Sequence, residues 1–101
     1  MTIAAFVPNL LDRSRFDDQV TFVDSPSEVE ILAPSLVIVD LDRCSDIEGF
    51  RVSGSATVMG FGPHVDTDLH REATVHGYDE VLARSLFFKR LPELLSSWSE
   101  S

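Results

Sequence analysis

Short apolar runs separated by polar segments dominate the pattern of this sequence. Four runs have the length and the β-branched or aromatic content of strands, and a short fifth candidate follows Gly77. They cover residues 3–7, 20–23, 36–41, 56–59 and 80–83. The third run is apolar without alternation as far as Asp40, which is typical of a strand covered on both faces. We therefore expect this run to form a central strand of a parallel sheet.

The segments between these runs carry signals for helices. Ser25 is a suitable N-cap, and Pro26 fits the first turn of a helix that leads to residue 32. Residues 66–76 predict another helix, which Gly77 closes in a plausible C′ position. A wide apolar stripe after residue 85 predicts a C-terminal helix that Pro92 interrupts or kinks. The segments on either side of Asp40 are short, so we expect the first three helices to have one to three turns.

Strands that alternate with helices predict an α/β fold with helices on both faces of a parallel sheet. Right-handed crossovers and a central third strand favour a doubly wound, five-stranded sheet in the order 2-1-3-4-5, a flavodoxin-like three-layer sandwich with shortened helices. A chain of 101 residues is long enough for one modest core. We therefore expect one domain over residues 1–101, with residues 96–101 as a frayed tail.

Composition and charge exclude several classes of partner. The formal net charge of -9 repels nucleic acid and anionic membranes, and the scattered acidic residues are typical of a solvated surface. Cys44 is the only cysteine, so no internal disulfide is possible, which fits a reducing compartment. The first eleven residues lack the basic lead of a signal peptide, and no apolar run approaches the ~20 residues that would span a bilayer. We expect a soluble cytoplasmic protein.

Candidate chemistry follows the strands, because ligands of open parallel sheets bind beyond the carboxyl ends of the strands. The segments there are Pro8-Asn9, Asp24, Asp40 with Asp42, residues 60–63, and Arg84. We interpret the glycine-rich residues 60–63 as a tight turn that leaves the fourth strand, since the further glycine, lysine and hydroxyl residue of a P-loop are missing.

Two segments resemble response-regulator receiver domains. Residues 36–40 end in Asp40 as the third strand of that family ends in the phosphoacceptor aspartate. Residues 76–84 are similar to the segment in which a helix ends at glycine, the fifth strand follows and a lysine closes it. Together with the order of strands and helices, the resemblance covers most of the chain, and it implies the receiver fold.

Several family positions depart from the pattern that phosphoryl transfer needs. The acidic pair that holds Mg²⁺ in receivers falls on Pro8-Asn9, and the hydroxyl after the fourth strand falls on Gly60 or Gly62. The conserved family lysine falls on Arg84, which keeps a positive charge. These departures predict a degenerate receiver, or pseudo-receiver.

The positions of these residues after the strands also predict a pocket at one end of the sheet. We expect Asn9, Asp40, Asp42, Gly62 and Arg84 to converge there. Asp40 is expected to be a structural carboxylate that is paired with Arg84 or solvated. No cofactor is expected; Mg²⁺ enters only if the protein is phosphorylatable, on a weak site from Asn9, Asp40 and the Asp42 carbonyl.

The function expected from this resemblance is that of a stand-alone pseudo-receiver, a non-enzymatic module for protein–protein interaction or regulation. By analogy with the family, its contact face for a partner or a second copy is the fourth helix, the fifth strand and the fifth helix, with Phe87, Phe88 and Trp98 as anchors. The alternative is a phosphorylatable single-domain regulator in which Asp40 attacks a phosphohistidine donor.

A further alternative is a metal-binding protein that uses the segment from His64 to His70. His64, Asp66 and His70 offer enough ligand atoms for a divalent ion. The same segment is also explained without a metal: acidic residues stabilise the N-terminus of a helix, and the histidines are then incidental. We therefore expect no metal site there.

Overall fold

A computed structural model describes residues 2–16, 18–51, 56–63 and 67–100. Its centre is a sheet of five parallel strands in the order β2-β1-β3-β4-β5. The strands are β1 (Ile3–Phe6), β2 (Val20–Phe22), β3 (Leu36–Asp40), β4 (Thr57–Gly62) and β5 (Glu80–Ala83). The doubly wound fold and the strand order expected from the sequence are thereby confirmed.

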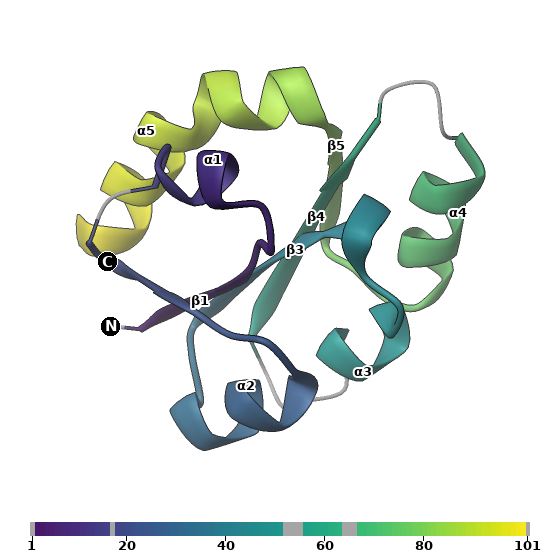
Figure 1. Ribbon diagram of the computed structural model, residues 1–101, viewed down its shortest axis with the longest axis horizontal. Coiled ribbons are helices and arrows are strands. Elements are labelled where there is room, and N and C mark those ends of the chain that lie inside the picture. Colours follow the sequence, from purple (N-terminus) through teal and green to yellow (C-terminus); the bar gives the residue numbers. More distant parts are fainter. Residues whose placement is uncertain (1, 17, 52–55, 64–66, 101) are drawn as a thin grey trace.

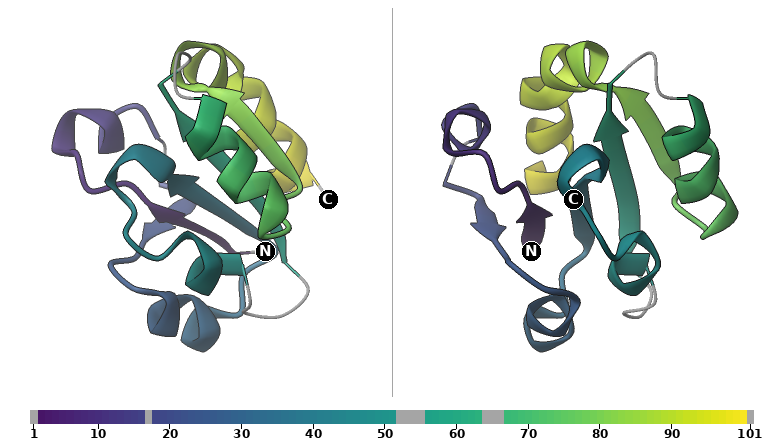
Figure 2. Two further views of the ribbon diagram at one scale, coloured as in Figure 1. Left: turned by 90° about the vertical axis from the view of Figure 1, so that its right-hand side faces the viewer. Right: turned by 45° about the vertical axis from the view of Figure 1, so that its right-hand side comes forward.

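Helices cover both faces of this sheet, as Figures 1 and 2 show. They are α1 (Leu10–Arg13), α2 (Pro26–Leu32), α3 (Ile47–Arg51), α4 (Thr67–Val75) and α5 (Arg84–Glu100), with a short 3₁₀ turn, η1 (Leu41–Arg43), after β3. α1 and α5 lie on one face, and α2, α3 and α4 lie on the other. The first three helices are as short as the sequence predicts.

The core consists of two apolar clusters, one on each face of the sheet. β3 is buried along its whole length, and its side chains alternate between the two clusters. Leu36 and Ile38 pack toward α5, whereas Val37 and Val39 pack toward α2, α3 and α4. This double burial explains why the third run of the sequence is apolar without alternation.

The end of β4 differs from the sequence-based expectation. Residues 60–63 were expected to be a tight turn, but β4 continues to Gly62, and Phe61 is fully buried. Its ring stacks on Phe87 of α5 with centroids 4.5 Å apart. Gly60 belongs inside the strand because a Cβ there would lie 2.8 Å from Cδ1 of Leu41. The glycines here allow close packing, and the turn prediction was wrong.

Residues with a left-handed backbone follow the ends of α2 and α4. Ala33 ends α2 in the left-handed region with φ 47°, and Gly77 adopts φ 91° just after α4, as a C′ glycine should. α5 continues through Pro92 as one helix, although proline removes one helical hydrogen bond. Within the described ranges, no helix has both the length and the apolar character needed to cross a membrane.

Candidate functional site

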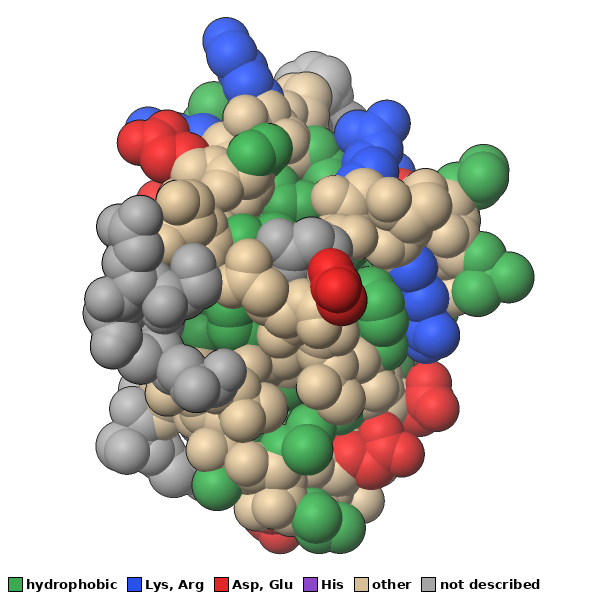
Figure 3. Space-filling view, turned by 90° about the vertical axis from the view of Figure 1, so that its left-hand side faces the viewer, with side chains coloured by type: hydrophobic (Ala, Val, Ile, Leu, Met, Phe, Trp, Pro, Cys, Tyr) green, Lys and Arg blue, Asp and Glu red, His purple; other side chains and the backbone are tan. Residues whose placement is uncertain are grey.

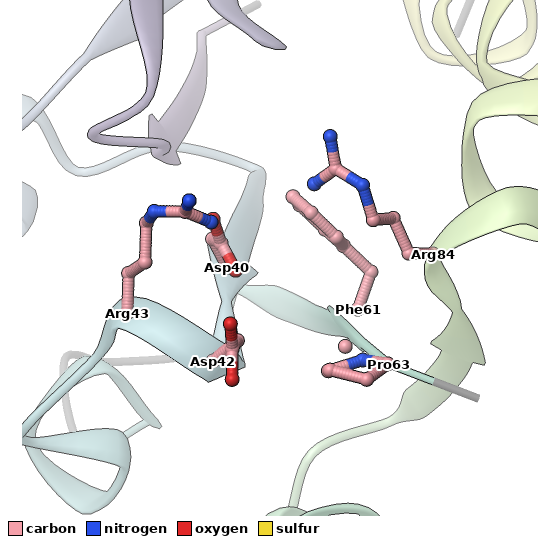
Figure 4. Close-up of a pocket in the computed structure, with 7 residues that line it drawn as sticks. Asp40, Asp42, Arg43, Phe61, Pro63 and Arg84 are labelled. Carbon is pink, nitrogen blue, oxygen red and sulfur yellow. The ribbon is translucent and has the colours of Figure 1, made fainter. Parts of the chain in front are cut away.

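A pocket of about 270 Å³ opens beyond the carboxyl ends of β3, β4 and β5. Figure 4 shows it with the side chains that line it. The lining residues are Asp40, Asp42, Arg43, Phe61, Gly62, Pro63 and Arg84. Four of the five residues predicted to converge at this end of the sheet, Asp40, Asp42, Gly62 and Arg84, therefore do so.

Asp40, the last residue of β3, is buried at the base of this pocket. The residue is only 1% exposed, and its closest cation is Arg43, whose Nη1 lies 3.5 Å from Oδ2. The η1 turn brings Arg43 back over the carboxylate, as Figure 4 shows. Burial raises the pKa of Asp40, and the positive charge of Arg43 opposes this shift. The local environment therefore disfavours the ionised form of the carboxyl.

Arg84 binds Asp12 rather than Asp40. Its Nη1 donates to Asp12 Oδ2 at 2.7 Å, and its Nη2 donates to Asp12 Oδ1. The Asp12 side chain is 4% exposed, whereas the Arg84 side chain is 39% exposed. Hydrogen bonding from Arg84 lowers the pKa of Asp12 despite its burial. The expected Asp40–Arg84 pair was wrong because α1 supplies a carboxylate that takes both donors of the guanidinium.

Asn9 serves the start of α1 and does not line the pocket. Its Oδ1 accepts hydrogen bonds from the backbone N–H groups of Leu11 and Asp12, at 2.8 and 3.2 Å. This is the usual role of an N-cap asparagine, which satisfies amides that have no partner inside the helix. Asn9 was expected in the pocket, and the capping contact is the physical reason that it is not.

Asp12 and Asn9 are not available as ligands for a Mg²⁺ ion at this end of the sheet. A hard dication needs several anionic oxygens. Both Asp12 oxygens bind Arg84, and Asn9 Oδ1 caps α1. Among the residues that the structure describes, no three His, Cys, Asp or Glu side chains are grouped so that they could hold a metal ion.

Of the three predicted partner anchors, Phe87 lies in the core instead of at the surface. Phe87 has no exposed surface and packs among Phe16, Phe61 and Phe88, so it cannot reach a partner in this state. Phe88 is half-buried, with the guanidinium carbons of Arg15 and Arg84 4.8 and 5.0 Å from its ring centroid. The apolar stripe predicted α5 correctly, but most of that stripe belongs to the core. The side chain of Trp98 lies outside the described part.

The candidate metal segment is only partly described. His64 and Asp66 lie outside the described residues, so that prediction stays open. His70 of α4 has a buried Nε2 without a hydrogen-bond partner in the described part of the chain. This atom lies 3.8 Å from the position that a Cβ on Gly62 would occupy.

Asp12 is the site residue that the sequence reasoning missed. Its signal is weak: an asparagine N-cap three residues before an acid, in a segment too short to show helical periodicity. Nothing in the spacing of residues 9–13 indicates that this acid is buried. Its role follows only from the packing of α1 against the start of α5.

Comparison with known proteins supports the fold assignment. No protein-family model and no curated protein matches the chain. Among solved structures, the crystal structure of a response regulator from Hahella chejuensis is similar, with a TM-score of 0.67 and 17% sequence identity. The alignment covers 96% of this chain and 93% of that one. The chain therefore shares the fold of a response regulator over nearly its whole length.

Proposed function

We propose that this chain is a receiver-like module that acts through protein contacts and does not transfer a phosphoryl group. One observation carries the proposal: the cation at the end of β5, Arg84, is already bound to the buried carboxylate of Asp12. In the resemblance stated above, this cation occupies the place of the lysine that closes the fifth strand. An internal ion pair therefore takes the cation that a phosphoryl group would need.

The environment of Asp40 supports the same proposal. A carboxylate that attacks a phosphoryl donor must be ionised and must reach the donor. Asp40 is almost fully buried, and burial raises its pKa. The transferred group also carries charge that a cation must stabilise, and the donors near Asp40 do not fit Mg²⁺. Both requirements of the reaction are poorly met at this residue.

The position of Gly62 supports it as well. Gly62 ends β4 at the pocket, and glycine has no side-chain hydroxyl to follow a phosphoryl group. The stacked rings of Phe61 and Phe87 hold β4 against α5 without any ligand. We infer a module that presents one constant surface to its partners rather than a surface that phosphorylation switches.

The charge of the chain narrows the class of partner. With a net charge of -9, direct contact with nucleic acid or an anionic bilayer is opposed by repulsion. The partners of this module are therefore proteins, in a cytoplasmic setting, and the module has no enzymatic activity.

The test is incubation of the purified protein with acetyl phosphate and Mg²⁺, followed by intact mass measurement. We expect no added phosphoryl group, whereas an active receiver treated in parallel should gain one. Asp40→Asn is the matched control. A phospho-adduct on the wild type that is absent from Asp40→Asn would refute the proposal and support the phosphorylatable alternative.

A further inference from the structure

The outer edge of β2 has backbone groups that no described strand or helix covers. β2 is the last strand on its side of the sheet, and Figure 2 shows no strand beyond it. Val23 N donates to Ala5 O of β1 at 2.9 Å, so the alternation of a parallel ladder directs Phe22 to the opposite edge. The N–H and C=O of Phe22 are therefore available to an added strand.

An apolar pocket lies directly beside this edge. It has a volume of about 260 Å³, and β2 and α2 form its walls. Its lining residues are Thr21, Phe22, Val23, Glu28, Ile31 and Leu32. Ile31 is 83% exposed, although it is a large apolar side chain. Figure 3 shows apolar side chains at the right and lower margins of this side of the molecule, with both basic and acidic side chains between them.

Acidic residues lie in, or next to, the segments that line the pocket. Glu28 lines it, Asp24 follows the end of β2, and Glu30 precedes Ile31 on α2; Asp24 and Glu30 are exposed. Arg13 lies beside them: its Nη2 is 3.6 Å from Asp24 Oδ1, and its guanidinium carbon is 4.9 Å from the centroid of the Phe22 ring. The local charge is therefore negative, and it suits a partner with positive side chains.

We propose that this region, the β2 edge surface (Phe22, Glu28, Ile31 and Leu32), binds an extended segment of a partner protein. The segment carries a large apolar side chain flanked by lysine or arginine. Its backbone pairs with Phe22, its apolar side chain enters the pocket, and its cations face the acids. The inference rests on the proposed function as a protein-binding module and specifies the chemistry of the partner.

A second copy of the chain fits this surface less well than a basic segment does. Two copies that meet through their β2 edges bring the same acids together, and like charges placed opposite each other are unfavourable. A basic segment removes that repulsion. The two occupants therefore differ in a measurable way, since only the basic segment needs a second component.

The probe is a capped seven-residue peptide with a central leucine, threonines on either side and a lysine at each end. It is titrated into the ¹⁵N- and methyl-labelled full chain and followed by NMR. We expect shifts at the Phe22 amide and at the methyl groups of Ile31 and Leu32. A peptide with glutamates in place of the lysines should bind about tenfold or more weakly, which corresponds to about 1.4 kcal/mol.

Two exposed positions provide matched variants. Ile31→Ser should weaken binding of the lysine peptide, and Val75→Ser should not, because Val75 is similarly exposed, at 76%, but lies on α4. A peptide N-methylated at the leucine and its neighbours should also bind more weakly, since it lacks the N–H groups that pair with a strand.

Several results would overturn the inference. These are no shifts with millimolar lysine peptide, shifts confined to α4, β5 and α5, or equal binding of the glutamate peptide. Concentration-dependent shifts at the β2 edge surface without any peptide would identify a second copy as the occupant instead. A phospho-adduct on Asp40 would refute the proposed function and leave these binding results unchanged, so the two failures are distinguishable.

Discussion

The ion pair between Asp12 and Arg84 should respond asymmetrically to the loss of each partner. Asp12→Asn leaves a guanidinium that is 39% exposed and can be hydrated where it stands. Arg84→Gln leaves a carboxylate whose side chain is 4% exposed and therefore poorly hydrated. An unpaired buried charge is costly, so Arg84→Gln should destabilise the protein more than Asp12→Asn does.

The size of the two effects follows from the burial of the pair. Removing one partner of a fully buried pair costs about 3–5 kcal/mol. Arg84 is more than one third exposed, and solvent screening reduces this figure to about 2–3 kcal/mol for Arg84→Gln. Asp12→Asn loses charge-assisted hydrogen bonds but leaves no buried charge, so about 1 kcal/mol is expected. The double variant should lose less unfolding free energy than the two single variants lose together, and the difference, the coupling energy, should be about 1 kcal/mol.

The assay is urea unfolding of the four proteins at neutral pH, followed by far-ultraviolet circular dichroism. Equal slopes against urea concentration would show that the midpoints report stability alone. An equal or larger loss for Asp12→Asn would refute the asymmetry argument. Strictly additive losses in the double variant would show that the two side chains do not interact energetically.

Two further predictions concern Asp40 and the end of β4. Because burial raises the pKa of Asp40, its ionised form costs folding free energy at neutral pH, and this cost disappears as the pH falls through the raised pKa. Asp40→Asn should therefore be more stable than wild type by about 1 kcal/mol at neutral pH, and this difference should shrink in acid. Urea unfolding at two pH values tests this, and a difference that does not depend on pH would contradict it. Gly60→Ala should lose about 2 kcal/mol in the same assay because its Cβ would lie 2.8 Å from Cδ1 of the buried Leu41. Gly62→Ala, whose Cβ would lie 3.3 Å from Leu69 Cδ2, should lose clearly less, and equal losses would contradict the packing argument.

The fold could be predicted because its signals are local and strong. The uninterrupted apolar run of β3 indicated a strand buried on both faces, and Gly77 marked the end of α4 before β5. The end of β4 could not be predicted in the same way. Glycine is common in turns, so Gly60 and Gly62 suggested one. Only the side chains packed against β4 show that these positions have little room for a Cβ.

The candidate site was less predictable, because local spacing does not show which residues pair when they are far apart in the sequence. Asp40, Asp42, Gly62 and Arg84 were expected at one end of the sheet from strand ends alone, and that part is confirmed. The choice between Asp12 and Asp40 as the partner of Arg84 depends on how α1 packs, and residues 10–13 are too few to show periodicity. Phe87 was expected at a partner surface but lies in the core, because the sequence alone does not show which of the two an apolar residue of the last helix contacts.

The contribution of α5 to one face of the sheet has a consequence for synthesis on the ribosome. Phe87, Leu91 and Leu95 belong to the cluster that covers Ile3, Ala5 and other residues of the earlier strands. Asp12 likewise meets its partner only 72 positions later in the chain. Until the last helix has emerged, a nascent chain with all five strands keeps an uncovered apolar face and an unpaired carboxylate. Completion of this fold therefore has to wait until α5 has left the ribosome, and a nascent chain without α5 exposes apolar surface that favours aggregation.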